Sequence, residues 1–117
     1  MQGTNAIAKV LKSEGVEYLT CFPNNAIIEG AASEGIRPIC ARTERVAVNI
    51  ADGLSRASNG RRIGVCAVQY GPGCENAFSG VAQAYADASR SCFCRARSSA
   101  SGRASRRTSR PSTTTAK

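Results

Sequence analysis

The chain has 117 residues, which is the size of one domain. No apolar run approaches the roughly 18 residues of a membrane-spanning helix, and no basic and then apolar segment opens the sequence as a secretion signal does. We therefore expect a cytoplasmic protein without a membrane partner. Residues 1–88 contain eight basic and eight acidic residues, so the whole net charge of +8 lies in residues 89–117.

The six cysteines predict free thiols rather than a disulfide framework, because Cys40 and Cys66 lie inside apolar, strand-like runs where a thiol packs as a small hydrophobic group. Cys92 and Cys94 are separated by one residue, which is closer than the usual spacing of zinc ligands. The chain has no histidine to complete such a site. We therefore expect no metal site.

Helices and strands are predicted to alternate along residues 4–86. The spacing of Ile7, Val10 and Leu11 predicts a helix over residues 4–14, which Gly15 ends. The other predicted elements are strand 17–22, helix 26–34, strand 37–41, helix 44–58, strand 63–68 and helix 74–86. This order predicts an α/β fold with three layers, in which helices flank a parallel sheet. Strand 63–68 is a continuous apolar run, typical of a strand buried on both faces.

Three segments follow predicted strand ends, namely Pro23, Thr43-Glu44 and Gly71-Pro72-Gly73. Ligands of parallel sheets gather beyond the carboxyl ends of the strands, so we expect these segments to converge on one rim. Taken alone, Glu44 is an acidic residue in a first helical turn, where the helix dipole favours it. The glycine-rich turn is a poor phosphate loop, because Pro72 has no N–H to donate and the phosphate-loop glycine patterns are absent.

Several features occur in a fixed order along the chain: Glu44, an Ala51-Asp52-Gly53 helix, a buried strand, the Gly71-Pro72-Gly73 turn with Asn76 beyond it, and Ala84-Tyr85-Ala86-Asp87. This order resembles the N-terminal pyrimidine-binding domain of the thiamine diphosphate-dependent acetolactate synthase and 2-oxoacid decarboxylase family. The resemblance covers residues 3–88. It implies that the chain binds thiamine diphosphate as part of a carboligase or decarboxylase acting on 2-oxo acids.

The resemblance assigns Glu44 the catalytic role. A carboxyl group hydrogen-bonded to the pyrimidine ring of the cofactor helps the thiazolium carbon to lose its proton, and such a group works best where water is scarce. Gly71, Pro72, Gly73 and Asn76 are implied to bind the cofactor, the turn by bringing the backbone close to the pyrimidine ring. Asn76 has a second interpretation, as a cap of local backbone groups.

Other positions depart from the family pattern. Thr43 stands where the family often has a histidine, so no role of that histidine is assigned here. Cys21 and Asn24 replace glycines, and no substrate contact is assigned to them. Asp52 is interpreted as a structural residue of its helix, because the metal motif of the family belongs to another domain.

The resemblance also implies a partner. In the family the diphosphate group and Mg²⁺ are held by a second domain, which we expect to be absent from this chain. The chain is then a half-site that is inactive alone and belongs to a homo-oligomer at full length. A stand-alone subunit that pairs with a separately encoded diphosphate-binding subunit is an alternative.

Residues 89–117 contain no Ile, Leu, Val, Met, Asp or Glu, which predicts a disordered Ser/Arg-rich tail. Cys92, Phe93 and Cys94 require codons that begin with T. After the loss of one base upstream, each T would be the middle base of an original codon, and such codons encode only apolar residues. The lost frame therefore holds an apolar strand, as the resemblance implies at this point. We expect residues 89–117 to be out of frame and residues 1–88 to be a truncated domain.

A different class of function is a small nucleic-acid-binding protein. Arginines clustered in residues 89–117 would bind phosphate backbones without sequence specificity. The balanced charge of residues 1–88, and the presence of only one aromatic residue in the tail, Phe93, favour the thiamine diphosphate interpretation.

Overall fold

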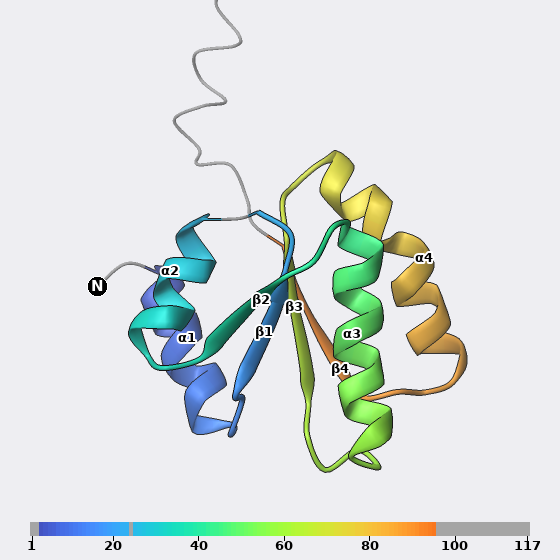
Figure 1. Cartoon of the computed structure of the whole chain (residues 1–117), viewed down its shortest axis with the longest axis horizontal. Helices are drawn as coiled ribbons and strands as arrows, with labels where there is room; N and C mark the ends of the chain where they lie inside the picture. Colours follow the sequence, from blue (N-terminus) through green and yellow to red (C-terminus); the bar gives the residue numbers. More distant parts are fainter. Residues whose placement is uncertain (1–2, 24, 96–117) are drawn as a thin grey trace, which may run out of the picture.

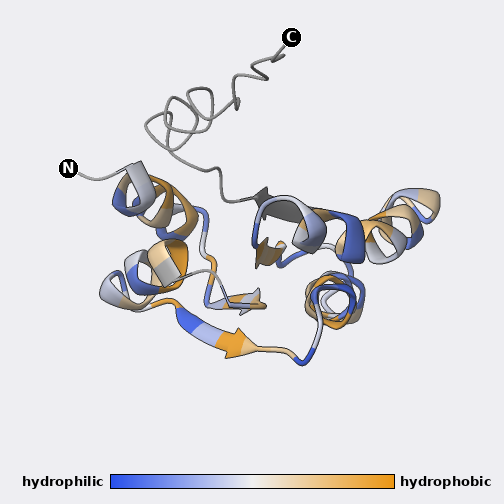
Figure 2. Cartoon of the chain, turned by 90° about the horizontal axis from the view of Figure 1, so that it is seen from above, coloured by the Kyte–Doolittle hydropathy of each residue, from blue (hydrophilic) through white to orange (hydrophobic). Residues whose placement is uncertain are grey.

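A computed structural model describes residues 3–23 and 25–95 of the chain. The elements are α1 (Gly3–Ser13), β1 (Tyr18–Cys21), α2 (Asn25–Ser33), β2 (Arg37–Cys40), α3 (Glu44–Ala57), β3 (Gly64–Val68), α4 (Pro72–Ala86) and β4 (Ser91–Arg95). The strands form an open parallel sheet in the order β2-β1-β3-β4. Helices α1 and α2 cover one face, and α3 and α4 cover the other (Figures 1 and 2). The predicted three-layer α/β fold is confirmed.

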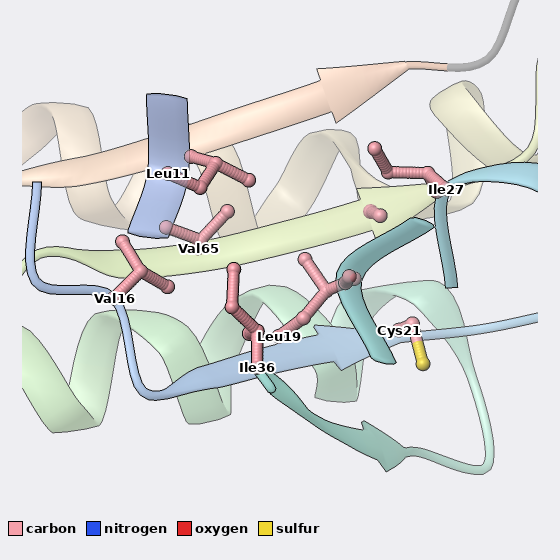
Figure 3. Packing of buried hydrophobic residues seen from close by; sticks show 9 residues of the cluster. Leu11, Val16, Leu19, Cys21, Ile27, Ile36 and Val65 are labelled. Carbon is pink, nitrogen blue, oxygen red and sulfur yellow. The ribbon is translucent and has the colours of Figure 1, made fainter. Parts of the chain in front are cut away.

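Strand β3 contributes to two separate cores, because its successive side chains point to opposite faces of the sheet. Val65 and Ala67 pack under α1 and α2, in the cluster of which Figure 3 shows a part. Cys66 and Val68 pack under α3 and α4. All five residues of β3 are buried, as the apolar run predicted.

Glycines bring α3 close to its neighbours. A Cβ atom at Gly64, the first residue of β3, would lie 1.8 Å from the carbonyl oxygen of Ala51 in α3. A Cβ atom at Gly80 in α4 would lie 2.9 Å from Asn49 Oδ1 and 3.0 Å from the Val48 side chain, both in α3. Real Cβ atoms do not approach other atoms so closely, so α3 packs against backbone at both positions. The path of α3 across the sheet therefore requires glycine at positions 64 and 80, where a larger residue would collide with α3.

Strand β4 differs from the sequence-based expectation of disorder from residue 89. It pairs in parallel with β3, from Gly64 opposite Ser91 to Val68 opposite Arg95. The chain turns back directly after α4, where the Ser89 N–H donates to the Ala84 carbonyl at 2.9 Å. Cysteine and phenylalanine both suit a strand, which is why a segment without Ile, Leu or Val still adds to the sheet. The fold extends to Arg95, and the predicted tail over residues 96–117 lies outside the described residues.

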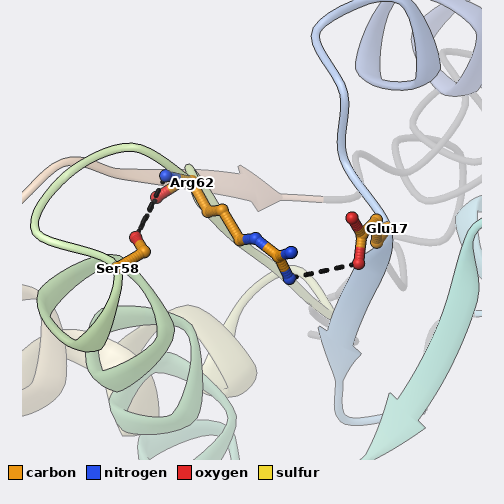
Figure 4. A network of polar contacts seen from close by, with 3 residues as sticks. All are labelled: Glu17, Ser58 and Arg62. Atoms are coloured by element: carbon orange, nitrogen blue, oxygen red, sulfur yellow. Dashed lines mark hydrogen bonds and ion pairs between the residues drawn. The ribbon is translucent and has the colours of Figure 1, made fainter.

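Ion pairs link separate segments at the end of the sheet where the strands begin. Arg62 Nη1 lies 3.2 Å from Glu17 Oε2 and joins the loop before β3 to the loop before β1 (Figure 4). Arg56 Nε lies 2.8 Å from Asp52 Oδ2, and its Nη2 lies 2.8 Å from Asp87 Oδ2. Asp52 therefore helps to join α3 to the end of α4. In the described part of the chain, no helix is long and apolar enough to cross a membrane.

Candidate functional site

The first turn of α3 is fixed by two threonines. Thr43 has extended backbone (φ −148°), and its Oγ1 accepts from the Val46 N–H at 3.3 Å, so it caps the helix. Thr20 lies on β1, and its buried hydroxyl donates to the Ala47 carbonyl at 2.7 Å. The Val65 carbonyl lies 3.1 Å from the same hydroxyl. Glu44 therefore sits in a turn that is both capped and anchored to the sheet.

Glu44 is buried, with 7% of its surface exposed. An acidic residue that only complements the helix dipole remains in water, because burying a carboxylate is costly unless it is paired. Burial of Glu44 is therefore not explained by its position in the first turn alone. Its surroundings must account for it.

The glycine-rich turn brings α4 against Glu44. Gly71 has φ 69° and ψ −123°, a conformation that glycine adopts readily and other residues do not. Pro72 is the first residue of α4, where its missing N–H costs nothing. A Cβ atom at Gly73 would lie 3.3 Å from Glu44 Oε1, so only the absence of a side chain leaves that oxygen clear. The helix begins two residues earlier than predicted because Pro72 suits its first position.

Asn76 lies near the start of α4, and its Nδ2 donates to Glu44 Oε2 at 3.3 Å. Asn76 is exposed whereas Glu44 is buried, so the pair stands at the edge of the rim. The structure thus brings together Glu44, Gly73 and Asn76, three of the five predicted site residues. Gly71 and Pro72 form the turn that positions Gly73 and Asn76 on α4.

Two contributors were missed by the sequence analysis. Thr20 lies inside a strand and has no motif that marks it, yet it anchors α3. Gln69 follows β3, and its Cβ would lie 3.4 Å from a Cβ at Gly73, so it forms part of the wall around the glycine. Neither position carries a signal in the sequence, because their roles depend on which helix crosses above them.

This arrangement suits proton exchange with a nitrogen-containing ring. A carboxyl group with little water contact, one oxygen held by an amide donor and the other facing a glycine, can hold or share a proton with a ligand atom. The glycine provides the close backbone approach that a flat ring requires. The residues present therefore fit the pyrimidine part of thiamine diphosphate. Within the described ranges, no group of three or more His, Cys, Asp or Glu side chains could hold a metal ion.

Glu44 does not line the hollow that lies between α3, α4 and the sheet. This hollow is lined by Val48, Cys66 and Val81, among others. The hollow lies against apolar side chains of the core under α3 and α4. The hollow offers few polar groups to a ligand, whereas Glu44 and Asn76 provide polar groups at the start of α3 and α4.

Comparison with known proteins bears on the family and the fold of the chain. Residues 1–106 match the family model described as "Thiamine pyrophosphate enzyme, N-terminal TPP binding domain". The chain is 38% identical over 92 residues to a probable acetolactate synthase large subunit of Methanocaldococcus jannaschii, covering 76% of this chain and 15% of that protein. It is 36% identical over 85 residues to a probable 2-ketoarginine decarboxylase of Pseudomonas aeruginosa, covering 70% of this chain and 15% of that protein.

Solved structures share the fold. Benzoylformate decarboxylase from Polynucleobacter necessarius matches with a TM-score of 0.72 and 20% identity, over 86% of this chain and 19% of the other. A putative thiamin diphosphate-dependent enzyme from Mycobacterium smegmatis matches with a TM-score of 0.74 and 14% identity, over 90% of this chain and 20% of the other. The chain thus spans about a sixth of the curated relatives and a fifth of these structures.

Proposed function

Because the chain belongs to the thiamine pyrophosphate enzyme family, whose N-terminal binding domain matches residues 1–106, we propose that it supplies the pyrimidine half-site of a carboligase or decarboxylase acting on 2-oxo acids. The observation that carries the proposal is the buried Glu44, with Asn76 on one oxygen and Gly73 beside the other. This half-site would contact the pyrimidine ring of the cofactor and not its diphosphate group.

Each residue has a distinct role in this proposal. Glu44 holds a hydrogen bond to a ring nitrogen and shares its proton with it. Asn76 orients the carboxyl group of Glu44 by donating to Oε2. Gly73 leaves space for the ring, and Gly71 and Pro72 set the start of α4 that positions Gly73 and Asn76. When bound, thiamine diphosphate supplies the electron sink for breaking or forming the bond beside the carbonyl group of a 2-oxo acid.

The proposal includes a partner. The diphosphate group and Mg²⁺ would be held by a diphosphate-binding domain, either in a longer form of this protein or in a separate subunit, and the complete enzyme would be a homo-oligomer. The chain alone would be inactive. We also propose a cytoplasmic location, which the free thiols of Cys21, Cys40 and Cys74 support, because thiols stay reduced there.

The direct test uses the chain itself and the aminopyrimidine part of the cofactor. Two-dimensional NMR of the labelled protein, titrated with 4-amino-5-hydroxymethyl-2-methylpyrimidine, should shift amide signals over residues 43–45 and 71–77. Glu44→Gln should abolish these shifts. The control is Glu75→Gln, which changes an exposed acidic residue in the first turn of α4. This variant should show the same shifts as the wild type. Shifts that survive Glu44→Gln, or that occur only at the opposite rim, would contradict the proposal.

A further inference from the structure

Two cysteines stand side by side at the carboxyl ends of neighbouring strands. Cys21 is the last residue of β1 and Cys40 is the last residue of β2, and the two are partners in the parallel register. Figure 3 shows Cys21 at this end of β1, with its sulfur on the side of the strand where β2 lies. Register partners in a parallel pair project from the same face of the sheet, so both thiols share one side.

The contacts of the two thiols place both sulfurs beside the end of β2. Cys21 Sγ donates to the Ile39 carbonyl at 3.6 Å, and Cys40 Sγ donates to the Ala41 carbonyl at 3.8 Å. Neighbouring strands lie about 4.7–4.9 Å apart. A disulfide needs Cα atoms about 4.4–6.8 Å apart, so the backbone is already within the range for cross-linking.

The two thiols differ in access to water. Cys21 is 1% exposed and belongs to the core under α1 and α2, whereas Cys40 is exposed on an edge strand. An oxidant dissolved in water therefore meets Cys40 first. Cys21 is buried next to Cys40 and is shielded from the same oxidant.

We propose that Cys21 and Cys40 form a redox-active dithiol, a modification site at which a hydroperoxide converts the two thiols into a cross-strand disulfide. This inference concerns thiol chemistry and is independent of the proposed cofactor site. It needs only the pairing of β1 with β2, which the sheet itself provides.

The reaction has two steps. The Cys40 thiol loses its proton to water, and the thiolate attacks one peroxide oxygen. The O–O bond breaks, and Cys40 becomes a sulfenic acid. The departing hydroxide, or alkoxide if the peroxide is organic, takes up one proton from water and leaves as water or an alcohol. The Cys21 sulfur then attacks the Cys40 sulfur, the S–O bond breaks, and the hydroxide leaves with the Cys21 proton as a second water. Two thiols are oxidised by two electrons, and one peroxide is reduced. A small dithiol reverses the change by exchange.

The order of the steps follows from the environment of Cys21. Burial, together with the neighbouring Cys40 thiol, raises the pKa of Cys21 to about 11, so Cys21 stays protonated at neutral pH. A protonated thiol reacts slowly with peroxide, because the thiolate is the nucleophile. Cys21 is therefore suited to the second step, in which it is held next to its target.

The disulfide would tighten the segment that leads into the Glu44 site. The Ala41 N–H already donates to the Cys21 carbonyl at 2.8 Å, and Thr43 caps α3 two residues further on. A covalent bond from Cys40 to β1 would hold this segment at the edge of the sheet. Oxidation should raise the melting temperature of the chain, and the dithiol should return it to its starting value.

The test is peptide mass mapping of the full chain. Trypsin does not cut between Arg37 and Pro38, so one peptide, residues 13–42, carries both cysteines, and another, residues 63–90, carries Cys66 and Cys74. After one equivalent of hydrogen peroxide, unfolding and alkylation with iodoacetamide, peptide 13–42 should be lighter by two hydrogens and unalkylated. Peptide 63–90 should be alkylated twice. Peroxide treatment in urea should remove this selectivity.

Variants separate the proposed pair from general oxidation. Cys40→Ser changes an exposed side chain and should leave Cys21 alkylated after peroxide treatment. Cys74→Ser is the matched control and should leave the cross-link unchanged. If native peptide 13–42 takes up two alkyl groups, or Cys40 proceeds to a sulfinic acid without the link, the proposal is overturned. The measurement on the unmodified chain decides this even if a variant fails to fold.

Discussion

Glu44 shows how the environment of one residue narrows its possible roles. A glutamate after a strand and before a helix has an ordinary explanation in the helix dipole. Burial to 7% exposure, an amide donor on one oxygen and a glycine beside the other are not needed for that role. They are what a carboxyl group that meets a ligand nitrogen requires. In the proposed function, the chemistry of the site therefore depends on this side chain.

We expect Glu44→Gln to slow proton exchange at the thiazolium carbon of bound cofactor by about 10²–10⁴-fold, the usual contribution of a positioned acid–base group. The measurement needs a complete enzyme. Residues 3–88 can replace the matching segment of the M. jannaschii relative, which is 38% identical to this chain. Exchange is then followed by deuterium loss from the cofactor. Glu75→Gln in the same hybrid is the control, and an equal effect of both changes would show that Glu44 has no special role.

Cys21 makes stability depend on pH in the alkaline range. Its pKa is raised from 9.0 to about 11 in the folded chain. Between these values the folded state keeps a proton that the unfolded state loses, so the free energy of unfolding falls as pH rises. Its contribution is fully present below pH 9. We expect the urea midpoint, measured with a reductant present, to fall more steeply from pH 9 to 11 in the wild type than in Cys21→Ala; parallel curves would contradict this.

At the scale of elements, the contact between α3 and β3 is the most demanding in the fold. Gly64→Ala would place a methyl group 1.8 Å from the Ala51 carbonyl oxygen, so α3 would have to move. We expect a loss of about 3 kcal/mol or more in the free energy of unfolding, the upper part of the range for overpacking. Denaturant unfolding checks this.

Gly53→Ala is the matched control for this prediction. It makes the same chemical change on the exposed side of α3, where nothing lies within 4 Å of the new methyl group. Alanine should stabilise the helix by about 0.5–1 kcal/mol. If both variants change stability by similar amounts, α3 does not pack on β3 as closely as the structure has it.

The hydrogen bond from Thr20 to Ala47 joins α3 to β1. Thr20→Val keeps the shape of the side chain but removes the donor, so we expect a loss of about 1–3 kcal/mol in the free energy of unfolding. Thr20→Ser keeps the hydroxyl and should retain most of the hydrogen-bond contribution. Urea denaturation of both variants makes the comparison. Equal loss in the two variants would assign the effect to packing and not to the hydrogen bond.

The elements themselves could be predicted from the sequence, because each is marked locally. The continuous apolar run over β3 predicted its burial on both faces, and glycines marked the ends of α1 and α2. The contact of Asn76 with Glu44 could not be derived from spacing, since it depends on how α3 and α4 lie side by side. Only the family resemblance placed Asn76 in the site. Strand β4 was missed because its residues carry no aliphatic pattern, although β3 offers them an edge.

At the scale of the molecule, the proposed site is one side of a larger arrangement. The chain spans about a sixth of its curated relatives. We expect the isolated chain to show no turnover of pyruvate and no Mg²⁺-dependent tight binding of thiamine diphosphate, because the proposed site contacts only the pyrimidine ring. Titration calorimetry with and without Mg²⁺ checks this. Affinity in the micromolar range that requires Mg²⁺ would show that this chain is sufficient by itself.

The direction of β4 has a practical consequence for anyone who labels this protein. Since β4 runs parallel to β3, Arg95 lies at the same rim as Glu44 and the start of α4 (Figure 1). A fluorophore attached at the end of β4 would therefore report on events at that rim, and could obstruct them. Surface immobilisation is better directed to the turn at Asn59 and Gly60, at the opposite rim, where a linker would leave the face that carries Glu44 free.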